Sequence, residues 1–422
     1  MLVSCFNVNG NDGSVIIGDG VPSSYAYDAF GRIRVSNPYT LFDSSNRYAD
    51  NGKFATATTG TATATFNANE GLIDLDVGTA SGDEVLRESQ VVFAYQPGKS
   101  LLIMNSFTFD TAKTNLRQRV GYFGSDNGFY LEQNDSTISL VKRSKVTGSV
   151  VNTEVTQANF NTDKLDGTGP SGFTLDLTTS QLMFMDMEWL GAGSVRLGFV
   201  IEGQFIIAHR FDWANQSTNT GTYITTASLP IRYEITNTGT VASASQLKQI
   251  CSTVISEGGY EMNGLQGVAG TPINSAYTLT TAGVFYPLVS IRLKSARLDA
   301  VALMSAMSTI GTGNNIYFNW KITRGGSITG GTWVSGGTDS AVEYNITGTA
   351  FTSTGSVDLT SGYNVSSNQG GGSTDLLKEA LFRFQLRRDS FTSTPEILTV
   401  LLATDTGGND GYASMDWEEV TR

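Results

Sequence analysis

The chain has 422 residues, of which 40% are hydrophobic and only 16% are charged, and it contains 47 glycines. This length predicts two or three domains, and little charge with many glycines and β-branched residues favours an all-β protein rich in tight turns. The net charge of −12 argues against nucleic acid and against anionic membranes as partners, because both attract lysine and arginine.

The N-terminal sequence MLVSCFNVNGNDG predicts no secretion signal, since it lacks a basic segment followed by a long apolar run. The sequence contains no run of 18 apolar residues, so no transmembrane helix is predicted. Cys5 and Cys251 lie far apart and in no metal-ligand spacing, so neither a disulfide framework nor a metal site is expected. We therefore expect a protein made in a reducing cytoplasm that reaches its destination by another route, such as assembly into a particle.

The first segment, residues 1–54, is rich in turns and has few positions for regular secondary structure. We predict an extended N-terminal arm that lays aromatic anchors onto another domain or a neighbouring subunit. A local β-hairpin subdomain is the alternative. The predicted anchors of this assembly arm are Tyr27, Phe30, Tyr39, Phe42 and Tyr48.

Residues 55–260 contain about twelve short apolar or alternating runs, which Gly, Asn, Asp or Pro separate. Short strands at this regular spacing predict a jelly-roll β-sandwich. The clearest pair is SVRLGFVIEGQFIIAHRF, in which Glu202 and Gly203 form a two-residue hairpin turn.

The Gly-rich segment 261–272 is predicted to be a linker, and residues 273–422 a second β-sandwich. Within the second domain, residues 296–308 fit a short helix or a strand equally well. The polar stretch 353–375 is predicted to be a long exposed loop.

Candidate chemistry begins at QLMFMDMEWLG, where Asp186 and Glu188 fall on one side of a predicted strand, about 6.5–7 Å apart. Paired carboxylates perform glycoside hydrolysis. The phrase resembles the catalytic strand of family-16, laminarinase-type glycosidases, which reads Glu-x-Asp-x-Glu on a concanavalin-like jelly roll. Phe184 stands where that pattern has its nucleophile, so the resemblance implies a degenerate glycosidase or a sugar-binding remnant. Two polar residues on the wet concave face of a sheet are the plainer alternative.

His209, the only histidine of the chain, is predicted to share a face with Phe205, Ile207 and Phe211. A single histidine among apolar neighbours is most often a hydrogen-bonded core residue, and it excludes a two-histidine metal site. No nucleophile elbow and no phosphate-binding loop occurs, so no catalytic residue, cofactor or metal is predicted. Asp186, Glu188, Trp189 and His209 remain a possible ligand groove.

Aromatic residues on exposed faces offer a second way to bind glycans, by stacking. The candidate clusters are YFGSDNGFYLE and HRFDWANQ, residues 122–132 and 209–216. Core packing explains these aromatic residues equally well.

Long phrases between residues 25 and 260 resemble a module of virion structural proteins of tailed bacteriophages, notably marine ones. They include AYDAFGRIRVSNPYTLFDSSNRYADN, LRQRVGYFGSDNGFYLEQN, DKLDGTGPSGFTLDL, MEWLGAGSVRLGFVIEGQFIIAH, LPIRYEITNT and KQICSTVISEGGY. The resemblance implies a virion subunit with a concanavalin-like jelly roll, acting as a head fibre, a capsid decoration, or a tail or baseplate component.

The leading hypothesis is therefore a non-enzymatic virion structural protein, assembled in the host cytoplasm and acting through contacts with other virion proteins. Sandwich domains in series suit a homo-oligomer, and a trimer is favoured. The alternative is a carbohydrate-binding module for host adhesion, whose partner is a host surface glycan.

Overall fold

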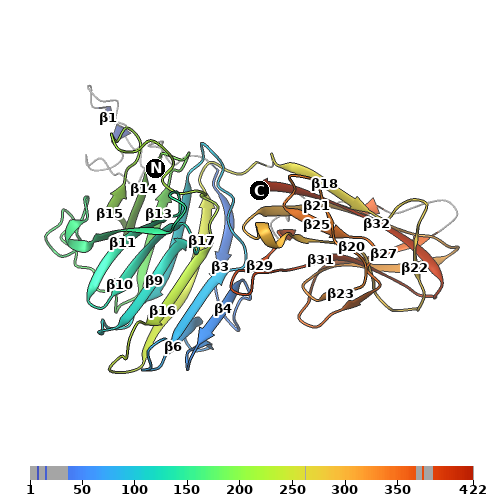
Figure 1. Ribbon diagram of the computed structural model, residues 1–422, viewed down its shortest axis with the longest axis horizontal. Coiled ribbons are helices and arrows are strands. Elements are labelled where there is room, and N and C mark those ends of the chain that lie inside the picture. The colour runs from blue at the N-terminus through green and yellow to red at the C-terminus, as the bar shows by residue number, and fades with distance from the viewer. Residues whose placement is uncertain are drawn as a thin grey trace, which may run out of the picture. The chain divides into compact units, whose positions relative to one another are not determined.

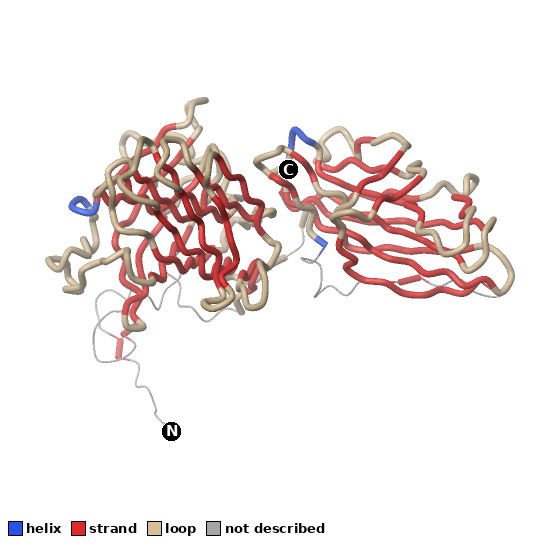
Figure 2. The backbone as a smooth tube through the Cα atoms, turned by 90° about the horizontal axis from the view of Figure 1, so that it is seen from below, coloured by secondary structure: helices blue, strands red, loops and turns tan. Residues whose placement is uncertain are grey.

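The computed structural model describes residues 7–8, 15–16, 37–261, 263–366, 373–374 and 384–421. The chain divides into two compact units, one of Met1–Ser89 with Tyr95–Tyr260 and one of Gln90–Ala94 with Glu261–Arg422. Within the described ranges helical structure is confined to short 3-10 turns, among them η2 (Gln157–Asn159) and η3 (Ser295–Arg297), and the rest of the regular structure is β-strand (Figures 1 and 2). None of these helical turns has the length or apolar character needed to cross a bilayer. The predicted all-β class is confirmed.

The first unit consists of two large antiparallel sheets and a two-stranded pair, β1 (Asn7–Val8) with β2 (Val15–Ile16). The seven-stranded sheet has the order β12 (Val151–Thr156), β11 (Thr137–Ser144), β10 (Gly128–Asn134), β9 (Leu116–Phe123), β16 (Ile231–Asn237), β7 (Glu84–Ser89) and β4 (Phe54–Thr59). The eight-stranded sheet has the order β15 (Gln204–Phe211), β14 (Val195–Ile201), β13 (Gln181–Met187), β8 (Leu101–Thr108), β17 (Ser245–Ser256), β6 (Leu72–Val77) and β5 (Thr63–Asn67), with β3 (Tyr39–Ser44) paired to β17.

The two sheets of the first unit face each other across a core. Alternate residues of the strands in both sheets point into it. Tyr233 of β16 is fully buried, and its hydroxyl lies 2.7 Å from the Ser252 hydroxyl of β17 in the other sheet. Phe129 of β10 likewise packs 5.5 Å from Phe211 of β15. Because strand side chains alternate between faces, these inward residues fix which residues of each strand point away from the core.

The hairpin turn at Glu202–Gly203 is confirmed. It joins β14 to β15, and both turn residues have positive φ angles, 50° for Glu202 and 78° for Gly203. Positive φ at both central positions matches the right-handed twist of the flanking strands, which is why a glycine stands there.

The predicted boundary of the N-terminal arm is wrong, because the sandwich begins before residue 55. Tyr39 and Phe42 belong to β3, whose residues pair with Ser252–Ser256 of β17. Phe42 is only 7% exposed and packs 5.9 Å from Phe54, so it anchors its own domain. Tyr48 is 84% exposed. The predicted anchors Tyr27 and Phe30 lie outside the described residues.

The second unit is also a sandwich of antiparallel strands. Its five-stranded sheet has the order β18 (Leu265–Gly270), β32 (Asn409–Thr421), β21 (Val301–Gly311) and β28 (Ser373–Thr374), with β19 (Tyr277–Leu279) paired to β32. Its six-stranded sheet has the order β24 (Val334–Ser335), β25 (Val342–Asn345), β20 (Tyr286–Leu293), β31 (Leu398–Thr404), β22 (Ile316–Arg324) and β27 (Val357–Ser366). Two short pairs complete it, β23 (Ser327–Thr329) with β26 (Ala350–Thr352) and β29 (Arg388–Asp389) with β30 (Thr394–Pro395).

A core of buried hydrophobic residues lies between the sheets of this second sandwich. It includes Met304, Phe318, Trp320, Leu402 and Trp417, all of them buried. Most come from the central strands of the two sheets, which run side by side in Figure 1.

Two boundaries in the second half of the chain differ from the sequence predictions. The predicted linker 261–272 contains β18, which pairs with β32, and the predicted loop 353–375 contains the ten-residue strand β27. The open choice at 296–308 is settled as a strand, β21. Residues 90–94, placed by sequence in the jelly roll, belong to the second unit, where the Gln385 side chain donates to the Val92 carbonyl at 2.9 Å.

Candidate binding site

The two carboxylates predicted to form a pair occupy different environments. Asp186 is the penultimate residue of β13, and its side chain is completely buried. It forms an ion pair with Arg196, its direct partner across β14. Asp186 is therefore not on a wet face, and the predicted exposed carboxylate pair is a wrong interpretation of this strand.

Glu188 lies just beyond the end of β13, in the tight connection to β14. Its amide donates to the carbonyl of Ser194 at 3.0 Å. A Cβ atom on Gly193 would lie 2.6 Å from Cγ of Glu188, so the turn requires a glycine there. Trp189 follows, and its amide donates to the hydroxyl of Tyr95, whose ring meets the indole edge-on at 5.7 Å.

His209 lies on the core side of β15, away from Asp186. A β-bulge beside Gly198 shifts the register, so His209 faces the buried Leu197 while Arg210 faces Arg196. This bulge separates His209 and Phe211 from Phe205 and Ile207, with which sequence alternation had grouped them. The four residues of the predicted groove therefore do not converge on one surface.

The surroundings of His209 hold it neutral. The Asn161 amide donates to Nδ1 at 3.2 Å, and the Phe211 ring lies 4.6 Å away. Burial lowers the pKa of His209, although the charge of Asp212 acts in the opposite direction. His209 is a hydrogen-bonded core residue, as the simpler prediction had it.

The ranges that the structure describes contain no candidate metal site. There, no three residues of the types His, Cys, Asp and Glu are gathered so that they could hold an ion. The expectation that the protein has no metal and no cofactor stays a prediction.

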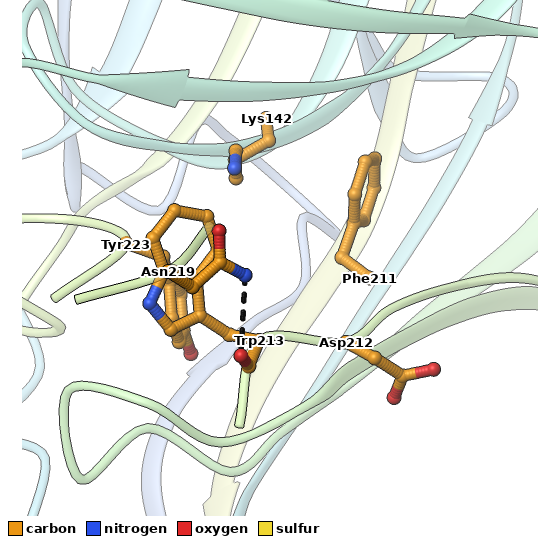
Figure 3. A pocket seen from close by; sticks show the side chains of 6 residues that line it. All are labelled: Lys142, Phe211, Asp212, Trp213, Asn219 and Tyr223. Carbon is orange, nitrogen blue, oxygen red and sulfur yellow. Dashed lines mark hydrogen bonds between the residues drawn. The ribbon is translucent and has the colours of Figure 1, made fainter. Parts of the chain in front are cut away.

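A small pocket opens where β15 ends and the chain turns into the following loop (Figure 3). It encloses about 100 Å³, the room of a few water molecules. Strand β11 contributes one lining residue from the other sheet of the same sandwich, and the loop after β15 contributes the polar rim. The lining residues are Lys142, Phe211, Asp212, Trp213, Asn219 and Tyr223, hereafter the Trp213 pocket.

Two hydrogen bonds hold Trp213 within the loop after β15, one at its indole and one at its backbone. The indole Nε1 donates to the Gly221 carbonyl at 2.6 Å. The backbone carbonyl of Trp213 accepts from the Asn219 side chain at 3.1 Å, the dashed line in Figure 3. The Lys142 ammonium lies 4.4 Å from the centre of the indole ring. Burial lowers the pKa of Lys142.

Tyr223 connects the Trp213 pocket to the turn that holds Glu188. Its ring lies 6.0 Å from that of Trp213, and its hydroxyl donates to the Glu188 carbonyl at 3.0 Å. Asp212 points away from the rings in Figure 3, and its carboxylate accepts from Ser194 at 2.9 Å and from Arg210. The pocket thus offers apolar ring surface, one ammonium group and one amide.

Sequence analysis found part of this site. The cluster HRFDWANQ contains Phe211, Asp212 and Trp213, and YFGSDNGFYLE contains Phe129, which packs 5.8 Å behind Tyr223. Lys142, Asn219 and Tyr223 were missed. Nothing in the sequence marks Lys142, because only the pairing of distant strands brings it over Trp213.

The chain matches no protein-family model, and no curated protein is significantly similar to it. Similar solved structures include the carbohydrate recognition domain of Emp47p, at 9% identity and a TM-score of 0.34, with 53% of this chain and 98% of that one covered. Another is the legume lectin-like domain from Entamoeba histolytica, at 10% identity and a TM-score of 0.30, covering 53% and 98%. A third is a glycoside hydrolase family protein from Mycobacterium thermorestibile, at 9% identity and a TM-score of 0.35, covering 51% and 99%.

The architecture is the all-β one predicted, a β-sandwich followed by a second β-sandwich. Identities and TM-scores this low carry no argument about what the chain binds. The function must be argued from its own residues.

Proposed function

We propose that the protein is a non-enzymatic binding subunit whose first sandwich holds a carbohydrate at the Trp213 pocket. The observation that carries this proposal is the half-buried indole, whose Nε1 is hydrogen-bonded to the Gly221 carbonyl, with the Lys142 ammonium over its ring and the Asn219 amide beside it. A sugar ring has apolar C–H faces and a rim of hydroxyls, so it needs a flat apolar surface with hydrogen-bonding groups beside it.

The absence of hydrolysis is part of the proposal, and two observations support it. Phe184 stands where the resembling glycosidases have their nucleophile, and phenylalanine cannot form a glycosyl-enzyme bond. Asp186 is buried in its ion pair with Arg196, which leaves it far from solvent.

The place of this subunit in a particle rests on the sequence resemblance. We propose that it serves a tailed bacteriophage virion as a fibre, decoration, tail or baseplate component and meets a glycan of the host surface. Contacts with other virion proteins and a homotrimeric state remain predictions.

The experiment compares two tryptophans, each of which lies beside a cation. Trp213 lies 4.4 Å from Lys142 in the first unit, and Trp333 lies 4.0 Å from Arg292 in the second. Full-length protein is screened on a glycan array, and the affinity for a retained monosaccharide is measured by calorimetry. We expect Trp213→Ala to weaken binding about 10- to 100-fold, since an aromatic anchor contributes roughly 1.5–3 kcal/mol. Trp333→Ala should bind like the wild type.

Equal affinity of Trp213→Ala and wild-type protein would overturn the assignment of the pocket. New reducing ends released from a retained glycan would overturn the non-enzymatic part. An array that retains no glycan would count against the carbohydrate function as a whole.

A further inference from the structure

The outer face of the six-stranded sheet in the second unit carries an aromatic and polar row along β22. Phe318 and Trp320 point into the core and are buried. The alternate residues Tyr317, Asn319 and Lys321 therefore point away from the core. Tyr317 and Lys321 lie four residues apart, so the row is about 13 Å long.

The strands on both sides of β22 extend this row across the sheet. Asn319 faces Tyr363 on β27 and Ala403 on β31, and direct partners share a face of the sheet. Tyr363 is 79% exposed and Tyr317 is 62% exposed. Ala403 is buried and small, so the surface of the sheet is depressed there between the larger aromatic side chains.

Two hollows of this face meet at Phe285. The first encloses about 230 Å³ among Tyr317, Asn319, Tyr363 and Ala403, and Asp405 stands at its rim. The second, of about 530 Å³, contains Lys321, Asp358 and Leu401. Phe285 lines both, so we treat them as one groove, the β22 groove.

The charges in the β22 groove are largely satisfied within it. Lys321 donates to Asp358 at 2.7 Å and lies 4.5 Å from the centre of the Phe285 ring. Asp405 accepts from the Tyr317 amide at 3.2 Å. Among the described residues that line the two hollows, Lys321 is the one cation, and its pairing leaves little attraction for an anionic ligand.

We propose that the β22 groove is a second binding site, for a neutral linear oligosaccharide that lies along the strand. The exposed tyrosines offer flat faces for sugar rings, and Asn319 and Asp405 offer an amide and a carboxylate for their hydroxyls. The row exceeds the width of a single sugar ring, so affinity grows with the number of sugars. This site belongs to the second unit alone and does not depend on the Trp213 pocket.

The test is made in the Trp213→Ala protein, full length, so that only the β22 groove is observed. Neutral and anionic oligosaccharides are screened on an array, and the retained neutral chain is titrated beside its own monosaccharide. We expect the oligosaccharide to bind at least 10-fold more tightly than the monosaccharide. Adding Tyr363→Ala should weaken it at least 10-fold, whereas adding Tyr48→Ala, which removes an equally exposed tyrosine from the first unit, should change nothing.

Several outcomes would overturn the β22 groove: no neutral oligosaccharide retained, equal affinity for anionic chains, or equal affinity with and without Tyr363. An oligomer that dissociates in Tyr363→Ala, seen by light scattering without any retained sugar, would instead assign this face to contacts between copies of the chain. A monosaccharide that binds the Trp213→Ala protein as tightly as it binds the wild type would overturn the Trp213 pocket and leave this groove standing.

Discussion

The two sandwiches differ in the side chains that point away from the core. On the seven-stranded sheet of the first, Arg119 lies between Glu132 and Glu234, at 2.5 and 3.2 Å, and Arg232 bonds Glu234 at 2.6 Å. Arg232 also forms an ion pair with Glu88 at 3.0 Å. Every side chain of this charge ladder is at most 12% exposed.

On the six-stranded sheet of the second sandwich, the corresponding positions hold rings that face solvent. Tyr317 and Tyr363 have most of their surface exposed, and the nearby Lys321–Asp358 pair is partly exposed as well. Paired, buried charges have few hydrogen bonds left for a ligand, whereas exposed rings gain free energy when a ligand removes them from water. The first face therefore contributes to folding and the second is available for binding.

The largest expected effect comes from breaking the charge ladder at Glu234. Burial alone would raise the pKa of Glu234, but Arg232, Arg119, Arg117 and Arg143 together outweigh it and lower the pKa. Glu234→Gln leaves Arg232 and Arg119 buried without that charge, which should cost about 3–5 kcal/mol of unfolding free energy. Asp358→Asn breaks the partly exposed pair of the second sandwich and should cost less than about 1 kcal/mol.

Urea denaturation measures both changes, and hydrogen exchange of β9, β10 and β16 locates the first. Equal losses in the two variants would show that the buried ladder is worth no more than a surface pair, and the contrast between the two faces would then disappear.

A smaller effect is expected from a pair of aromatic truncations. Phe42→Ala removes a buried ring from β3 and should cost about 3 kcal/mol, whereas Tyr363→Ala removes an exposed ring and should stay within about 0.5 kcal/mol. In thermal unfolding the first change corresponds to a decrease in Tm of roughly 6–12 °C. A Phe42→Ala protein as stable as the wild type would restore the sequence prediction that Phe42 serves as an anchor outside its own domain.

Sequence patterns predicted the sandwiches and the Glu202–Gly203 turn because both rest on local signals, alternation and positive-φ residues. They missed β3 because Leu41 and Phe42 are adjacent rather than alternating, and both are buried. They missed β27 because its polar and glycine-containing sequence forms a strand only through pairing with β22. Local alternation carries no information about such partners.

The candidate site was harder to predict for the same reason. A bulge adds one residue to a strand and inverts the alternation beyond it, and this is what moved His209 to the core side of β15. Gly198 lies at the bulge, where a Cβ atom would lie 2.0 Å from the Ile206 carbonyl oxygen. A glycine in the sequence is not sufficient to predict a bulge. Tyr363 and Asn319 meet only through the register of β22 and β27.

The smallest expected effect is a pH dependence that His209 gives to the first sandwich. Because its pKa is lowered in the folded protein, folding favours the neutral imidazole. Above a pH of about 6.5 the residue is neutral in both states and contributes nothing. As the pH falls below that value, the unfolded chain binds the proton first, so stability decreases by at most about 1.4 kcal/mol per pH unit.

His209→Asn isolates this contribution, since its side-chain oxygen can accept from the Asn161 amide as Nδ1 does. We expect the free energy of unfolding of the wild type to fall more steeply than that of the variant between about pH 7 and pH 5. Parallel curves would mean that His209 titrates alike in both states, and that its position beside Phe211 does not exclude water.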